Sequence, residues 1–166
     1  RSATFEYCQF IDGGENIADS GVIAPGGTSD QKDDRFSLTV DHCLFNSDGV
    51  TTAKKADGKD LVNGTSAICF PTMDRKLDIK ITNSTFRSMG HALATQTGYD
   101  YPENLSCLVE GNHFETNGYY ENSISEGMSY IDWAANAVIR NNIFHNTTGS
   151  ELLGPACTLK GGYATY

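Results

Sequence analysis

The sequence lacks any apolar run approaching the ~18 residues that a membrane-spanning helix requires, and no long stretch has the apolar period of an amphipathic helix. Residues 1–4 contain no signal-peptide hydrophobic region. Basic residues are few: 12 Lys and Arg stand against 21 Asp and Glu, which gives a formal net charge of -9. These absences argue against membrane insertion and disfavour nucleic acids and anionic surfaces as partners.

Cysteines occur in an odd number, five, and none forms a C-x-x-C pair. They are Cys8, Cys43, Cys69, Cys107 and Cys157. The pattern argues against a zinc site and a dense disulfide scaffold, and it leaves at least one thiol unpaired within the chain. We expect most of them to be small buried residues, while their disulfide state stays open.

The sequence does contain an internal repeat, and a repeat indicates the architecture more strongly than local patterns do. One segment of eight residues occurs five times and always ends in phenylalanine. The copies occupy residues 3–10, 38–45, 79–86, 107–114 and 137–144. A glycine follows each copy, and turn-forming residues are abundant, as expected of short strands joined by turns. The length fits one domain over residues 1–166.

Alignment of the copies on the phenylalanine gives columns of constant character. Two columns are apolar, namely Ala3, Leu38, Ile79, Cys107 and Ala137, and then Phe5, Val40, Ile81, Val109 and Ile139. The columns between and after them are mostly polar. This alternation predicts, in every copy, a strand with one buried face.

The alternation ends at residues that tolerate left-handed or bridge backbone angles, so we expect a turn at Tyr7, His42, Asn83, Gly111 and Asn141. The next column is small or amide-bearing and predicts a buried ladder of Cys8, Cys43, Ser84, Asn112 and Asn142. Each phenylalanine should then point inward and stack on its neighbour. We interpret His42 and His113 as hydrogen-bonded turn residues rather than bases.

A second apolar segment follows each glycine and is interpreted as the other strand of each coil. These segments are residues 17–23, 66–70, 91–95, 128–133 and 156–160. Residues 24–35, 50–64 and 97–104 lack a sustained period and are expected to project as loops. The uneven spacing of the copies excludes fixed-length helical repeats and suits a solenoid with variable loops.

The five copies resemble the repeat of the right-handed parallel β-helix superfamily, the pectin-lyase-like fold. The resemblance covers nearly the whole chain and implies an all-β solenoid of about five coils. It does not decide function, because this fold hosts polysaccharide lyases, hydrolases, epimerases, tailspikes, adhesins and structural domains. Enzymes of the superfamily act in a groove along the outside of one parallel sheet, using carboxylates, bound calcium, or an Arg or Lys base.

The matching surface here is the outward column Glu6, Asp41, Thr82, Glu110 and Arg140, with Lys80 beside it. Coils ~4.8 Å apart would allow Glu6 and Asp41 to share a calcium ion, and no other cofactor is implied. A lyase-type site would use Arg140 as the base, although Thr82 interrupts the acidic column. The alternative is a solvated polar face.

Aromatic residues offer a second kind of glycan contact. Trp133, Tyr99 and Tyr101 are candidates for stacking on sugar rings. The alternative for Trp133 is an inward position in the core.

The leading hypothesis is an extracellular or cell-surface module that binds polysaccharide along its outer sheet face. One alternative is a structural or adhesive subunit whose copies stack end to end into a filament; another is a lyase or hydrolase acting on polysaccharide. No cap precedes Ala3 or follows Lys160, which predicts that the chain is a fragment of a longer β-helix, or that another chain covers its ends.

Overall fold

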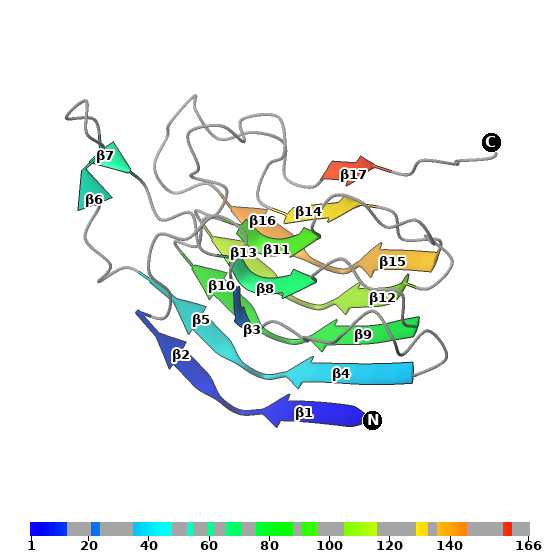
Figure 1. Cartoon of the computed structure of the whole chain (residues 1–166). Helices are drawn as coiled ribbons and strands as arrows, with labels where there is room; N and C mark the ends of the chain where they lie inside the picture. Colours follow the sequence, from blue (N-terminus) through cyan, green and yellow to red (C-terminus); the bar gives the residue numbers. More distant parts are fainter. Residues whose placement is uncertain are drawn as a thin grey trace.

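The computed structural model describes residues 1–12, 21–23, 35–47, 53–54, 60–61, 66–70, 76–87, 91–95, 105–115, 129–132, 136–145 and 158–160. The regular structure of these residues consists of strands. The strands form three parallel sheets of five strands each and one two-stranded antiparallel sheet (Figure 1). Within the described ranges, no helix is long and apolar enough to cross a membrane.

Each parallel sheet collects one strand from every repeat. The first sheet comprises β1 (Ser2–Glu6), β4 (Arg35–Asp41), β9 (Lys76–Thr82), β12 (Leu105–Glu110) and β15 (Asn136–Arg140). The second comprises β2 (Gln9–Ile11), β5 (Leu44–Asn46), β10 (Thr85–Arg87), β13 (His113–Glu115) and β16 (Ile143–His145). The third comprises β3 (Gly21–Ile23), β8 (Ser66–Phe70), β11 (His91–Thr95), β14 (Ser129–Asp132) and β17 (Thr158–Lys160).

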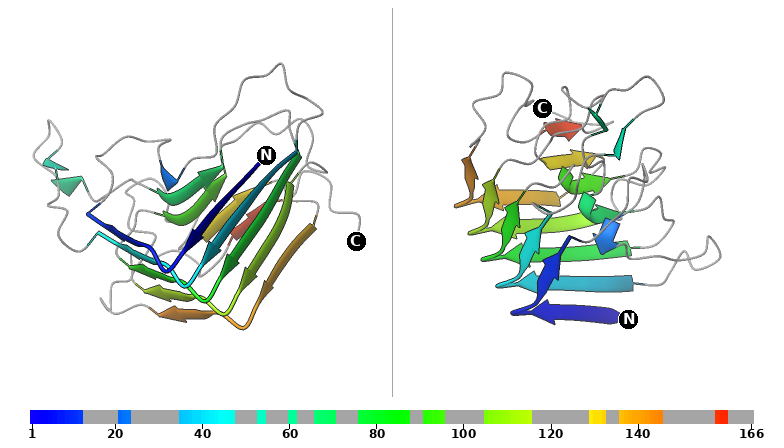
Figure 2. Two further views of the ribbon diagram at one scale, coloured as in Figure 1. Left: turned by 90° about the horizontal axis from the view of Figure 1, so that it is seen from below. Right: turned by 90° about the vertical axis from the view of Figure 1, so that its left-hand side faces the viewer.

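The chain visits the three sheets in turn and then starts again one layer further along the stack. Figure 2 shows the strands of the first and second sheets in layers that meet along a common bend. All strand pairs of these three sheets are parallel. Parallel stacking of equivalent strands from successive repeats is compatible with a β-solenoid.

The strand register confirms the alignment made on the sequence. In the first sheet Leu38 pairs with Ile79, and Ile79 pairs with Cys107. Val40 and Ile81 are likewise paired, and both are fully buried. The period-two alternation therefore separates an inner apolar face from an outer polar one, as predicted.

The phenylalanines form one continuous stack inside the molecule, as the sequence predicts. Ring centroids of successive pairs are 4.6, 4.9, 5.1 and 4.7 Å apart, from Phe10 through Phe45, Phe86 and Phe114 to Phe144. The rings are nearly parallel to their neighbours, with interplanar angles of 13° or less. Phe45, Phe86 and Phe114 are completely buried, whereas Phe10 and Phe144, in the outermost layers, are partly buried.

The predicted turn lies between the first and second sheets. Tyr7, His42, Asn83, Gly111 and Asn141 all have positive φ, between 50° and 69°. This left-handed conformation is costly for most side chains and is best tolerated by Gly and Asn. Five layers thus turn at the same backbone position with four different residue types.

A buried hydrogen-bond ladder follows the turn, as predicted. Asn142 Oδ1 accepts a hydrogen bond from the Asn112 amide at 2.9 Å, and Asn112 Oδ1 accepts one from the Ser84 amide at 2.9 Å. Ser84 Oγ accepts one from the Cys43 amide at 3.0 Å. Each side chain thereby joins its own layer to the preceding one, which pins the register of the bend.

Two sequence-based expectations need correction. The sequence gives each coil two strands, but the structure has three per repeat, because the residues around each phenylalanine pair separately after the left-handed turn. Residues 50–64 were expected to be a loop, yet β6 (Ala53–Lys54) and β7 (Asp60–Leu61) pair antiparallel there. The expected loop 97–104 and most of 24–35 lie outside the described residues.

Candidate functional site

The outer face of the first sheet carries a shallow hollow of about 420 Å³. Four strands line it, β4, β9, β12 and β15, so it runs across four layers of the stack. The outward residues that line it are Ser37, Thr39, Asp78, Lys80, Ser106, Leu108, Val138 and Arg140. Of the residues predicted as a ligand face, Lys80 and Arg140 line this hollow, whereas Glu6, Asp41 and Glu110 do not.

The polar and apolar lining residues are unevenly placed along the hollow. Thr39, Lys80, Leu108 and Val138 occupy one register column from β4 to β15. Val138 is 47% exposed although it is aliphatic. The column thus changes from hydroxyl to cation to aliphatic side chains within four layers.

Lys80 is a cation available to a ligand. Its ammonium group is exposed and makes no ion pair with another residue in the described part of the chain. The two nearby arginines are engaged, since Arg35 pairs with Asp78 and Arg140 pairs with Glu110. An anionic or hydroxyl group entering the hollow therefore meets Lys80 without breaking an ion pair to any residue that the structure describes.

Arg140 and Glu110 form a two-point ion pair on adjacent strands. Arg140 Nε donates to Glu110 Oε1 at 2.9 Å, and Arg140 Nη2 donates to Glu110 Oε2 at 3.0 Å. The hydrogen bond from Arg140 lowers the pKa of Glu110, and the carboxylate in turn raises the pKa of Arg140. Both effects hold Arg140 in its charged form, which opposes the role of a neutral base.

Asp41 accepts hydrogen bonds from three side chains at the edge of this face. Thr82 Oγ1 donates to Oδ1, and Asn83 Nδ2 donates to the same oxygen at 3.0 Å. His42 Nδ1 lies 2.7 Å from Oδ2. Thr82, which interrupts the acidic column in the sequence, is thus a partner of Asp41 in the neighbouring layer.

The pKa of Asp41 is lowered to about 2 by these contacts, first by the Thr82 hydroxyl and then by His42. Hydrogen bonds donated to a carboxylate favour its charged form. Asp41 is therefore an ionised, well-oriented group rather than a proton donor at neutral pH.

Glu6 pairs in register with Asp41 across β1 and β4, which places the two carboxylates of the predicted calcium site on adjacent strands. Asp41 already uses both oxygens in hydrogen bonds. Among the described residues, no group of three or more His, Cys, Asp and Glu side chains gathers around one point. Calcium at Glu6 and Asp41 stays a prediction.

The outside of the bend forms a second hollow of about 410 Å³, beside the first sheet. Tyr7 and His42 stack there with ring centroids 4.9 Å apart and an interplanar angle of 22°. Tyr7 is 75% exposed. The expectation that His42 is a hydrogen-bonded turn residue is confirmed by its contact with Asp41 and its positive φ.

The sequence pattern alone does not single out Tyr7, Leu108 and Val138 as surface features. The aligned columns carried the signal for Leu108 and Val138, because these apolar residues occupy a column that is polar in earlier copies. Tyr7 occupies the turn column, where a side chain as large as tyrosine is unexpected. The predicted sugar-stacking residues Trp133, Tyr99 and Tyr101 lie outside the described residues.

Comparison of the chain with protein-family models, with curated proteins and with solved structures finds no match.

Proposed function

We propose that the chain is a right-handed parallel β-helix of five coils, of the pectin-lyase-like kind, and that it binds an extended polysaccharide along the outer face of its first sheet. Parallel sheets that collect one strand from each of five repeats support the architecture. The hollow across β4, β9, β12 and β15 supports the binding surface, and it is the observation that carries the proposal.

The chemistry of the hollow suits sugars. Binding sites generally combine apolar contact area with a few polar groups that fix orientation. The aliphatic side chains of Leu108 and Val138 suit the C–H faces of sugar rings, while Lys80 and Thr39 offer hydrogen bonds to hydroxyl or carboxylate groups. A linear chain of rings crossing successive layers would meet these groups in turn.

A matched pair of variants tests this proposal. Val138→Asp places a charge in the hollow, whereas Ile143→Asp makes the same change on the second sheet, where Ile143 is 61% exposed. Binding to a panel of neutral and acidic polysaccharides is measured by calorimetry and by the shift in melting temperature. We expect Val138→Asp and Lys80→Ala to weaken binding by ~10-fold or more and Ile143→Asp to leave it unchanged. Equal loss in both aspartate variants, or no binding by the parent protein, would sink the proposal.

End-to-end assembly is a second candidate function. The partial exposure of Phe10 and Phe144, the outermost rings of the stack, favours it. Oligomers that grow with concentration in sedimentation experiments and dissociate after Phe144→Asp would support a filament. A monomer at every concentration would contradict it.

A lyase activity remains a separate proposal with its own test. It requires calcium-dependent release of unsaturated sugar products, abolished by Arg140→Ala. Glu110→Gln should also change the rate of product formation, because it removes the carboxylate that pairs with Arg140. Product formation that survives Arg140→Ala would remove Arg140 from the mechanism.

A further inference from the structure

The buried ladder changes its chemistry between the first two layers. From Asn142 to Cys43, each step uses a side-chain oxygen that accepts a backbone N–H from the preceding layer. At the last step, from Cys43 to Cys8, both side chains are thiols. Sulfur is a weak acceptor, so this step lacks the strong hydrogen bond that joins the other layers.

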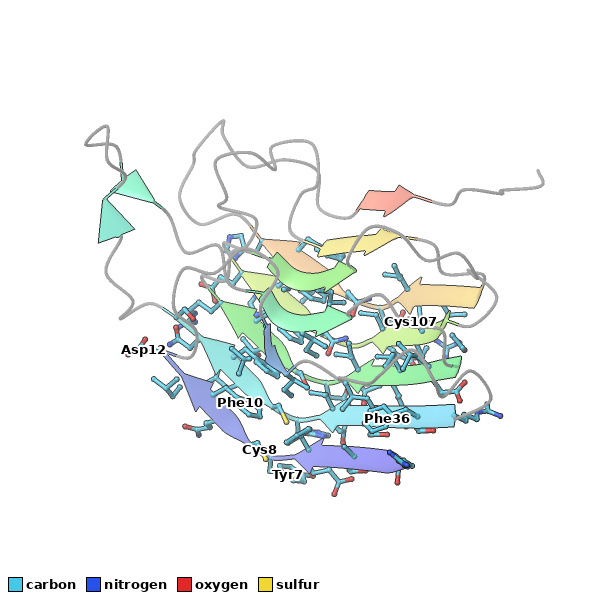
Figure 3. All side chains as sticks on the ribbon, in the orientation of Figure 1. Tyr7, Cys8, Phe10, Asp12, Phe36 and Cys107 are labelled. Carbon is cyan, nitrogen blue, oxygen red and sulfur yellow. The ribbon has the colours of Figure 1, made fainter. Side chains whose placement is uncertain are left out.

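The two cysteines are direct neighbours across that step. Backbone hydrogen bonds flank them on both sides, from the Tyr7 amide to the Asp41 carbonyl at 3.1 Å and from the Leu44 amide to the Cys8 carbonyl at 2.9 Å. Paired strands lie ~4.8 Å apart, which falls within the Cα separations of disulfide-bonded cysteines. Figure 3 places Cys8 at the bend between β1 and β2.

Both thiols lie beside the backbone of the first layer. Cys43 Sγ is 3.4 Å from the Phe5 carbonyl oxygen, so it reaches into the first layer. Cys8 Sγ is 3.4 Å from the carbonyl oxygen of Glu6, next to Phe5 in that same layer. Burial chiefly raises the pKa of the Cys43 thiol, and the backbone and thiol of Cys8 are among the neighbouring groups that also affect this pKa. Both residues are free thiols in this structure.

We propose that Cys8 and Cys43 are a redox pair that closes into a disulfide between the first and second layers. This disulfide would replace the missing ladder hydrogen bond by a covalent link. The oxidant is a low-molecular-weight disulfide such as glutathione disulfide, or the disulfide of a thiol oxidoreductase.

The order of events follows from exposure. Cys8 is partly exposed, while Cys43 is buried, and burial raises the pKa of its thiol. The oxidant therefore reaches Cys8 first, and the Cys8 thiolate attacks the oxidant disulfide, which gives a mixed disulfide and releases one oxidant thiolate. Cys43 then loses its proton and attacks Cys8 Sγ, which forms the Cys8–Cys43 bond and expels the second thiolate. The two protein thiols give up two electrons and two protons, and the oxidant becomes two thiols.

Among the described residues, no cysteine stands opposite Cys107 or Cys69 in the strand register. Cys107 pairs in register with Ile79 and Ala137, and Cys69 pairs with Ala94. Cys157 lies outside the described residues. Cys8 and Cys43 are thus distinguished from the other cysteines by their equivalent positions in adjacent layers.

The experiment titrates the folded chain with glutathione buffers of increasing oxidised fraction, blocks free thiols by alkylation, and maps disulfides by mass spectrometry without reduction. We expect a mass loss of ~2 Da, one cross-linked peptide pair containing Cys8 and Cys43, and a melting temperature ~5–10 °C above that of the reduced protein. Cys8→Ser should abolish both changes, whereas Cys107→Ala should retain the cross-link.

Three outcomes would overturn the proposal. They are a glutathione adduct on Cys8 that never resolves, a cross-link to Cys69 or Cys157 instead, and a Cys8–Cys43 link that forms only in denaturant. Because structural disulfides persist mainly in oxidising compartments, the state of this pair in the natural protein also tests the predicted extracellular location.

Discussion

Phe86, at the centre of the interior stack, and Lys80, on the outer face of the first sheet, belong to the same repeat but to columns of opposite kind. The Phe86 column contains phenylalanine in every layer, whereas the Lys80 column contains hydroxyl, cationic and aliphatic side chains in different layers. An interior residue has protein above and below it at the strand spacing, so it must match its neighbours. An outward residue meets solvent and is free to vary. Columns that repeat one residue type thus indicate the interior of the fold, and columns that vary indicate its surface.

The largest expected effect is on the interior stack. Phe86→Ala should lower the free energy of unfolding by ~3–5 kcal/mol, because it opens a cavity between two stacked rings. Phe10→Ala, in the outermost layer, should cost about half as much, since its ring is already partly exposed. Urea denaturation measures both values, and equal losses would contradict the layered core.

The ladder should show the next largest effect. Asn112→Ala deprives the buried Ser84 amide of its acceptor and should cost ~2–3 kcal/mol. Asn142→Ala should cost ~1 kcal/mol, because water can reach that partly exposed position. The same denaturation experiment compares them. A larger loss of unfolding free energy for Asn142→Ala than for Asn112→Ala would contradict the expectation that the more buried hydrogen bond contributes more to stability.

Asp41 links the outer face to stability through pH. Its folded-state pKa of about 2 is below the ordinary value of 3.8, so the folded state binds a proton less readily than the unfolded chain does. The resulting stability is present above pH ~4 and is lost as pH falls toward ~2. Because Asp41 is partly exposed, we expect ~1 kcal/mol in all. Unfolding free energies of the parent and of Asp41→Asn, measured from pH 5 to pH 2, should converge at the acid end; parallel curves would contradict the assignment.

The sequence predicted the interior well because each inward column repeats one chemical type, as Val40 and Ile81 illustrate. It predicted the left-handed bend because Asn and Gly recur at one position. It did not predict that Thr82 donates to Asp41 or that Arg140 is held by Glu110. These contacts join residues of different repeats, and they depend on side-chain orientations that vary from layer to layer. The sequence pattern predicts which column a polar residue occupies, but it does not predict which side chain that residue contacts.

The bend offers the smallest and sharpest test, because there the backbone repeats while the side chains differ. Gly111 has a φ of 69°, and a Cβ added there would lie 2.9 Å from Asn83 Oδ1, the end of a flexible side chain. Gly111→Ala should therefore cost ~1 kcal/mol, mainly from the left-handed conformation. Gly111→Asn adds the same Cβ but introduces the residue found at equivalent bends, and should cost less. Denaturation of the two variants side by side decides the matter: if asparagine costs as much as alanine, then crowding against Asn83, and not backbone strain, governs this column.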